Sequence, residues 1–281
     1  MKERLVKPHS TEAAGLPQRP HRVAVVNCGI DALTFSETLT EVERLIQARR
    51  PVQHCVVNAS KTVLMEGDAR LREIVSSCAL VNADGQSLVW ASQILGRPVP
   101  ERVTGIDVFT ALLGLAADRG YGVFFLGATS EVLEDAVARA RREHPSLPIC
   151  GWHHGFWGAT DDDELVAHVR AAQPDILFVA LPSPRKEYWL AERLEKLDVP
   201  FSMGVGGSFD VYAGRVKRAP LWMRRSGLEW AYRFWQEPLR MWRRYLLGNL
   251  KFVYLVVKYG RPGTAAVDAG RDHLADRSGT S

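Results

Sequence analysis

The sequence lacks the short motifs that would identify a zinc site, a disulfide framework or a nucleotide-binding loop. No CxxC pair occurs, so neither a zinc site nor a disulfide framework is indicated. The cysteines are scattered at Cys28, Cys55, Cys78 and Cys150, and we expect them to be buried, reduced thiols. No GxGxxG follows the first expected strand and there is no GxxxxGK(S/T) loop, so NAD binding and P-loop chemistry are only weakly supported.

Long apolar runs are also missing. The first twenty residues have no apolar core of the kind that a signal peptide needs, and no run of eighteen uncharged apolar residues occurs. We therefore expect a cytoplasmic protein without a transmembrane helix, in which residues 1–20 form a flexible leader. The chain has 281 residues, of which 46% are hydrophobic, and this is enough to fill a real core.

Positive charge is concentrated near the C-terminus. The formal net charge is +4, yet residues 215–260 contain eleven Lys or Arg and only two acidic residues. Ten aromatic residues lie between Trp222 and Tyr259. Pro220, Pro238 and Gly248 predict that this stretch forms three short helical pieces, and we interpret it as a basic helical appendage. Residues 261–281 show no periodicity and are expected to form a flexible tail.

The preceding residues alternate between strand-like and helix-like patterns. Strands are expected at 22–26, 53–57, 79–81, 123–126, 148–150, 176–180 and 199–205, and helices at 34–46, 60–75, 86–95, 107–118, 130–143, 162–172 and 184–197. Residues 27–33 are expected to be a loop, Thr34 and Glu37 form a capping box, and Ser183 has the position of an N-cap. Strands separated by such helices predict an α/β core over residues 21–214, with a mostly parallel, Rossmann-like sheet and helices on both faces.

Polar or glycine-rich turns follow most of the expected strands. They are Asn58, Asp84, the Gly127 turn, the Phe156 loop, the Pro184 turn and Asp210. The carboxyl ends of parallel strands meet at one edge of a sheet, where α/β proteins bind ligands, so these residues could line one cleft. Each one alone is more often an ordinary cap or turn residue. Asp84 lies between an apolar strand and the helix that follows, and it is the first candidate for a catalytic residue.

Two acidic or histidine-rich stretches do not indicate a metal site. Asp161, Asp162 and Asp163 begin an expected helix, where the helix dipole alone favours acidic residues. His153 and His154 are adjacent, so in an extended chain their side chains diverge. No metal ligand is therefore predicted.

The basic stretch admits three interpretations. Arg240 and Arg243 share a helix face that suits a diphosphate or an anionic lipid surface, and Arg233 precedes them. Interleaved aromatic residues could anchor the stretch at a membrane interface. A solvated basic helix packed through its Trp residues is about as well supported, and nucleic-acid binding is a third possibility.

Several blocks together resemble a known family. VNADGQSLVWA, PERVTGIDVF, VFFLGAT, PSPRKEYWL, MGVGGSFDVYAG, RAPLW and GLEWAYRFWQEPLRMWRRY occur in order between about residues 22 and 245. They resemble the WecG/TagA/CpsF family of glycosyltransferases. The resemblance implies inverting transfer of a hexose or N-acetylhexosamine from a UDP-sugar to a polyprenyl-diphosphate-linked sugar. It implies neither a bound metal nor a cofactor, and no nucleic-acid partner. It places the enzyme on the inner face of the plasma membrane, at an anionic membrane surface, and is compatible with a homo-oligomer.

The resemblance also implies roles for individual residues. Asp84 corresponds to the general base, and Arg102 to an arginine that offsets charge on the departing diphosphate. Phe156, where relatives carry Tyr, would stack on uracil, and Asp210 would contact the ribose or the base. The remaining implied substrate contacts are Asn58, Lys186 and Glu187 on the sugar side and Arg233, Arg240 and Arg243 at the diphosphate.

Two departures from the family pattern leave the donor sugar open. Lys186 replaces an amide in the PKQE block, and Val56 replaces a threonine two residues before Asn58. N-acetylmannosamine and glucose both remain candidate donor sugars. The alternative to an enzyme is a non-catalytic protein that binds a nucleotide sugar or a nucleic acid through the basic stretch.

Overall fold

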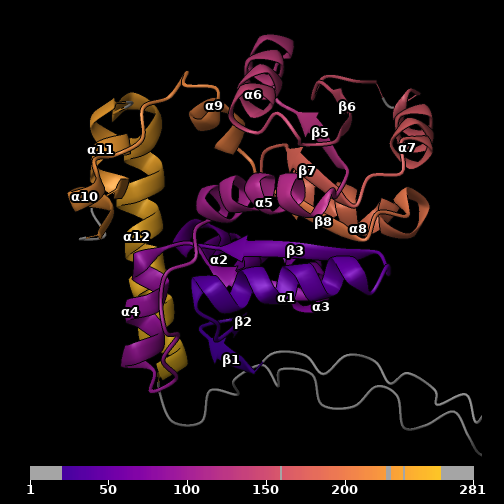
Figure 1. The fold of residues 1–281 in the computed structure, drawn as a ribbon. Helices are drawn as coiled ribbons and strands as arrows, with labels where there is room; N and C mark the ends of the chain where they lie inside the picture. The colour runs from indigo at the N-terminus through magenta and orange to yellow at the C-terminus, as the bar shows by residue number, and fades with distance from the viewer. Residues whose placement is uncertain (1–20, 159, 226–228, 237, 261–281) are drawn as a thin grey trace, which may run out of the picture.

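The computed structural model describes residues 21–158, 160–225, 229–236 and 238–260. The expected leader and tail, residues 1–20 and 261–281, lie outside these ranges. In the last two helices, several side chains are also outside the described part of the structure. Figure 1 shows the arrangement of the helices and strands along the chain.

Six parallel strands form the central sheet. They are β3 (Val52–Val57), β4 (Leu80–Ala83), β5 (Val123–Gly127), β6 (Ile149–His153), β7 (Ile176–Ala180) and β8 (Phe201–Gly204), in the spatial order β4-β3-β8-β7-β5-β6. All five neighbouring pairs are parallel, with His54 opposite Leu80 and Met203, for example. The parallel sheet predicted from the strand–helix alternation is confirmed.

Helices cover both faces of the sheet. The described helices before the C-terminal segment are α1 (Phe35–Gln47), α2 (Ala59–Gly67), α3 (Ala69–Ser77), α4 (Gln86–Ile94), α5 (Gly105–Arg119), α6 (Ser130–Glu143), α7 (Asp162–Ala171), α8 (Arg185–Leu197) and α9 (Ser208–Tyr212). α1, α5, α6 and α9 contribute to one hydrophobic cluster, whereas α7 and α8 pack against the alternate residues of the same strands. On β5, for instance, Phe125 belongs to the first cluster and Phe124 to the second, as expected for successive residues of a strand.

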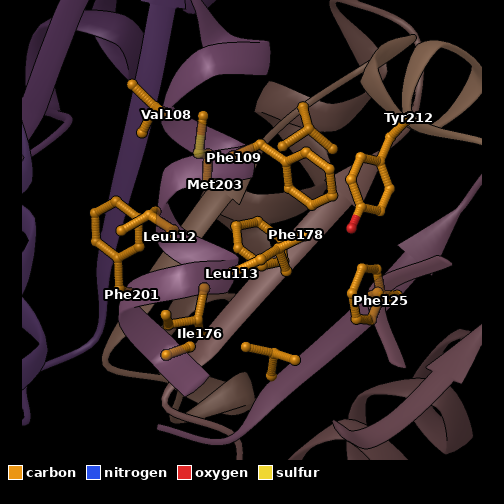
Figure 2. Packing of buried hydrophobic residues seen from close by; sticks show 14 of the residues in the cluster. Val108, Phe109, Leu112, Leu113, Phe125, Ile176, Phe178, Phe201, Met203 and Tyr212 are labelled. Atoms are coloured by element: carbon orange, nitrogen blue, oxygen red, sulfur yellow. The ribbon is translucent and has the colours of Figure 1, made fainter. Parts of the chain in front are cut away.

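Phe109 of α5 is the centre of the larger cluster. Its ring meets Phe178 edge-on at a centroid distance of 4.8 Å and Tyr212 at 5.3 Å, and it also contacts the ring of Phe125 (Figure 2). Phe109 is fully buried, and burying one such side chain contributes roughly 1.5–3 kcal/mol. This packing fixes α5 against the middle of the sheet and so fixes the position of its N-terminus.

The N-terminal region differs from the sequence prediction in two places. Residues 27–33 were expected to be a loop, but Cys28–Asp31 forms β2, which pairs antiparallel with β1 (Arg22–Val25). The single helix expected at 60–75 is two helices, because the side chain of Asp68 accepts a hydrogen bond from the Leu71 backbone and caps a new helix. The capping box of Thr34 and Glu37 is confirmed.

The C-terminal segment consists of α10 (Leu221–Arg225), α11 (Glu229–Gln236) and α12 (Pro238–Gly260). The break predicted at Gly248 is wrong, because α12 runs through it for 23 residues. Phe252, Leu255 and Val256 of α12 are buried in a third cluster together with residues of α2, α3 and α4. α12 therefore lies along the core on the side of α2 (Figure 1). Across the described ranges, no helix has the length and hydropathy needed to cross a membrane.

Candidate functional site

The parallel sheet brings the predicted strand-end residues to one edge. Asn58 follows β3 and caps α2, where its side-chain oxygen accepts a hydrogen bond from the Lys61 backbone at 3.1 Å. Asp84 follows the neighbouring strand β4, and its backbone N–H donates to the carbonyl of Val57 at 2.8 Å. A Cβ on Gly85 would come within 3.4 Å of Asn58. Asn58 and Asp84 therefore begin adjacent turns that pack against each other.

Asp84 is half-buried at the end of β4. Its negative charge is one of those that act on Arg218. Burial lowers the pKa of Arg218, but the hydrogen bonds and charge of Asp107, followed by the charges of Glu229 and Asp84, raise it above its ordinary value. The guanidinium of Arg218 is therefore close enough to Asp84 to interact with it electrostatically.

Two ion pairs join the loop after α4 and the first turn of α5 to the C-terminal segment. Arg102 Nη1 lies 3.2 Å from Glu229 Oε2, and both side chains are largely buried. Arg218 makes a bidentate contact with Asp107, with Nη1 2.6 Å from Oδ1 and Nη2 2.8 Å from Oδ2. Bidentate guanidinium–carboxylate pairs are strong and geometrically specific. The segment that begins after residue 214 is therefore held against the N-terminus of α5.

Asp107 is fixed from its own helix as well. Thr104 caps α5 and donates from Oγ1 to Asp107 Oδ2 at 2.5 Å, while the Asp107 backbone donates back to Thr104 at 3.2 Å. Burial acts to raise the pKa of Asp107, but the hydrogen bonds from Arg218 and Thr104 hold it below its ordinary value. Asp107 is therefore ionised at neutral pH.

Phe156 and Asp84 lie at opposite ends of the carboxyl edge of the sheet. The ring of Phe156 is 71% exposed, and this residue follows β6, the strand farthest from β4 in the sheet. Five strand spacings of about 4.8 Å separate the two strands, which is about 24 Å. The loop folds back toward the centre, because the Gly155 N–H donates to the carbonyl of Ala128 after β5 at 2.8 Å. The exposed ring is thus available to a flat ligand, but it does not contact Asp84.

A buried charge cluster lies between the first turns of α2 and α8. Lys61 is 4% exposed and donates to Glu187 Oε1 at 2.7 Å and to the carbonyl of Val56 at 2.6 Å. Glu187 is 1% exposed and also accepts from Ser183 at 2.9 Å. Burial raises the pKa of Glu187, but the charges of Lys61 and Lys186 outweigh it and bring the value to about 2. Glu187 is therefore ionised at neutral pH, and its contact with Lys61 joins the turns that follow β3 and β7.

Lys186 is the second cation of this cluster. Its Nζ donates to Ser183 Oγ at 2.6 Å and lies 3.3 Å from Glu187 Oε1. Burial, and then the neighbouring charge of Lys61, lower its pKa. A Cβ on Gly204 would come within 2.8 Å of the Lys186 side chain, so this glycine leaves the space that the lysine fills. The N-cap of α8 is Pro184, not Ser183 as expected, because the Ser183 hydroxyl bonds Glu187 instead.

The remaining predicted residues divide into two groups. Asp210 lies in α9, directly after β8, with its backbone carbonyl accepting from Arg215 and Val216. Arg233 lies in α11, and Arg240 and Arg243 lie in α12, but their side chains are outside the described part of the structure. The structure thus places Asn58, Asp84, Arg102, Phe156, Lys186, Glu187 and Asp210 at the carboxyl edge of the sheet or in its exit loops.

The sequence prediction missed four residues of this region: Lys61, Asp107, Arg218 and Glu229. Asp107 and Thr104 carried a detectable signal, since a threonine three residues before an acidic residue is typical of a helix start. Lys61 had none, because a lysine in the first turn of a helix normally faces solvent. Of the cysteines, Cys28, Cys55 and Cys78 are buried as expected, but Cys150 is exposed.

The described residues include no cluster of three or more His, Cys, Asp or Glu placed to hold a metal ion. Asp162 instead accepts hydrogen bonds from the indoles of Trp157 at 3.0 Å and Trp189 at 2.6 Å and pairs with Arg193. Asp162 at the start of α7 thus serves to pack this helix against α8. Metal independence of the reaction stays a prediction.

Known proteins resemble the chain over most of its length. A family model described as the glycosyl transferase WecG/TagA/CpsF family matches residues 23–265. An N-acetylglucosaminyldiphosphoundecaprenol N-acetyl-beta-D-mannosaminyltransferase of Bacillus spizizenii is 35% identical over 208 residues, which are 73% of this chain and 79% of the relative. Proteins of the same name from Bacillus subtilis and Staphylococcus aureus are 36% and 34% identical, over 66% and 67% of this chain and 71% and 73% of their own lengths. The chain is therefore an enzyme that belongs to the WecG/TagA/CpsF family of glycosyl transferases.

Proposed function

We propose that the protein transfers a hexose or N-acetylhexosamine from a UDP-sugar to a polyprenyl-diphosphate-linked sugar, with inversion and without a metal ion. The product belongs to an exopolysaccharide or another cell-envelope glycan. The observation that carries the proposal is the half-buried Asp84, which follows the edge strand β4 and acts electrostatically on Arg218 in the stretch after α9. The relatives named for transfer to a diphosphoundecaprenol-linked sugar support the acceptor class.

Asp84 is the general base of the proposed reaction. The acceptor hydroxyl attacks the anomeric carbon, and its proton passes to the Asp84 carboxylate as the new C–O bond forms. The bond between the anomeric carbon and the diphosphate oxygen breaks, and its electron pair leaves with UDP. Attack from the face opposite the leaving group inverts the anomeric centre. Arg102 offsets the charge that develops on the diphosphate.

The other strand-end residues bind the donor. Phe156, exposed on its loop, stacks on the uracil, and Asp210 contacts the ribose or the base. Asn58, Lys186 and Glu187 lie on the sugar side, where Lys61 holds the Glu187 carboxylate in place. Arg233, Arg240 and Arg243 come from the C-terminal helices and act on the diphosphate.

The enzyme acts as a peripheral protein on the inner face of the plasma membrane. The support is a stripe on α12 of exposed apolar residues at helical spacing, namely Leu250, Val253, Tyr254 and Val257. Exposed apolar residues on a basic helix suit insertion among anionic lipid headgroups. We name Leu250, Val253, Tyr254 and Val257 the apolar stripe.

A direct assay tests the proposal. The protein is incubated with a panel of UDP-sugars and a short-chain polyprenyl-diphosphate sugar, released UDP is measured, and the product is identified by mass and anomeric configuration. We expect UDP release with one donor, an inverted linkage, and no loss of activity with EDTA. Binding of UDP-sugars or oligonucleotides without UDP release would instead support the alternative, a non-catalytic binding protein.

A further inference from the structure

The exposed ring of Phe156 belongs to a loop that is held on both sides of this residue. The loop, residues 154–158, lies between β6 and α7, and we call it the phenylalanine loop. Before the ring, the Phe156 N–H donates to His154 Nδ1 at 3.2 Å, and the Gly155 N–H donates to the main chain after β5. After the ring, Trp157 is partly buried and packs against the cluster of β5, β7, α7 and α8.

One carboxylate binds the loop through its tryptophan. Trp157 Nε1 donates a hydrogen bond to Asp162 Oδ1 at 3.0 Å. Asp162 is itself fixed by α8, because Trp189 Nε1 donates to the same oxygen at 2.6 Å and Arg193 pairs with Oδ2. The phenylalanine loop is thus tied through Trp157 to a carboxylate that is anchored in the packing of α7 against α8.

Asp162 keeps its charge although its side chain is buried. Burial acts to raise its pKa, but the hydrogen bonds from Trp189, Trp157 and Arg193, together with the charge of Arg193, hold the pKa below its ordinary value. Hydrogen bonds to an ionised acceptor are roughly twice as strong as those between neutral groups. Asp162 therefore offers the Trp157 indole a strong acceptor at neutral pH.

The faces and edges of the Trp157 indole are also in contact with neighbouring groups. Its ring meets that of Trp189 at a centroid distance of 5.7 Å and that of His153 at 6.1 Å. The Arg185 guanidinium lies 5.2 Å from the centroid of the indole. These contacts restrict the orientation of Trp157, and since Phe156 precedes it directly, they also restrict the backbone that carries the exposed ring.

We infer that Asp162 is a positioning residue for the donor nucleotide: through Trp157 it holds the phenylalanine loop in the conformation that presents the Phe156 ring to the uracil. The inference rests on the proposed function, which gives Phe156 its stacking role. It adds a residue that touches neither the substrate nor the reacting atoms. Asp162 thus governs binding of the donor, and the chemical step does not depend on it.

A positioned loop reduces the cost of binding the nucleotide. Without the hydrogen bond from Trp157, the phenylalanine loop samples other conformations. The apparent Kd then rises in inverse proportion to the fraction of molecules that present the ring, so a fraction of about one fifth gives about 5-fold weaker binding. The bound complex itself is unchanged, and kcat therefore stays near that of the parent protein.

The test removes the two indole hydrogen bonds of Asp162 one at a time, and calorimetry on the full chain measures the Kd of UDP. Trp157→Phe keeps an aromatic ring but lacks the N–H, so we expect the Kd to rise about 5-fold. Trp189→Phe is the matched control, because it breaks the other indole bond to the same oxygen and leaves the bond from Trp157 in place. It should lower the thermal stability without changing the Kd.

A double-mutant cycle shows whether the effect passes through the exposed ring. Once Phe156→Ala has removed the ring, adding Trp157→Phe should weaken UDP binding no further. A tryptophan that only stabilised the fold would instead have the same effect in both backgrounds. An unchanged Kd in the folded Trp157→Phe variant, or an equal rise in Trp189→Phe, overturns the inference.

Asp162→Asn is the second variant, and it replaces Trp157→Phe if the latter does not fold. The amide keeps an oxygen for the indoles but loses the charge that pairs with Arg193, so we expect a smaller rise in the Kd. Weaker UDP binding in Phe156→Ala, with normal binding in the Trp157 or Asp162 variant, contradicts only the inference. Absence of UDP release from any donor, with the predicted binding pattern intact, upholds the inference and contradicts only the proposed transfer.

Discussion

The ammonium group of Lys61 lies 2.7 Å from Glu187 Oε1, and the two side chains are almost completely buried. They join the first turn of α2 to the first turn of α8, and so connect the turns that follow β3 and β7. Burial alone would lower the pKa of Lys61, but the charges of Cys55 and Glu187 raise it. The pair is therefore ionised, and it holds the carboxylate of Glu187, which we propose lies on the sugar side of the donor.

Removing one partner of this pair should destabilise the protein strongly. Lys61→Met leaves the Glu187 carboxylate buried without its main counter-charge, which we expect to lower the free energy of unfolding by about 3–5 kcal/mol. The double variant with Glu187→Leu removes both charges of the pair but leaves the buried Lys186 without this carboxylate, so we expect it to recover only part of the loss. Urea denaturation followed by circular dichroism measures both variants. A single variant as stable as the parent would mean that the pair contributes nothing.

The same carboxylate predicts a dependence of stability on pH. The pKa of Glu187 falls from 4.5 to about 2 on folding, so its contribution is fully present above pH 4.5. It is lost as the pH falls from 4.5 to about 2, because the unfolded chain then binds the proton first. Unfolding free energies measured over this range should fall less steeply in Glu187→Gln than in the parent protein. Identical slopes would contradict the assignment.

Asp84→Asn should stop the chemistry and leave binding intact. The amide keeps the shape of the side chain but cannot take the acceptor proton, so we expect kcat to fall by about 100-fold or more. The affinity for UDP, measured by calorimetry, should change little. Asp163→Asn, on the exposed start of α7, is the control for loss of one acidic charge. Near-normal turnover in Asp84→Asn would require another general base.

These positions show what the sequence can and cannot predict. Short apolar runs that alternate with helical patterns predict the strands, so the strand ends that carry Asn58 and Asp84 could be predicted from the sequence. β2 was missed because its four residues include a glycine and an aspartate, both disfavoured in strands, and only pairing with β1 makes it a strand. The ion pairs of Arg102 with Glu229 and of Arg218 with Asp107 could not be predicted, since the partners are far apart in sequence and meet only when the C-terminal segment packs against α5.

Phe156→Ala should weaken donor binding specifically. Stacking of a base on an aromatic ring is worth about 1–3 kcal/mol, so we expect KM for the UDP-sugar to rise about 5- to 150-fold with a smaller effect on kcat. Phe156→Tyr keeps the ring face and should behave like the parent. Steady-state kinetics with the donor varied gives both constants. A KM unchanged in the alanine variant would remove Phe156 from the nucleotide site.

The apolar stripe of α12 should govern partition onto membranes. Replacing Val253 and Val257 by Gln removes apolar surface that is more than half exposed, so the fold should be retained while binding to anionic vesicles falls by about 10-fold. Leu64→Gln on α2, another exposed apolar position, is the matched control and should bind vesicles normally. Vesicle sedimentation measures the bound fraction, and a water-soluble short-chain acceptor shows whether transfer survives. Binding that is unchanged in the double variant, but is abolished by high salt, would mean that basic residues alone hold the protein at the lipid surface.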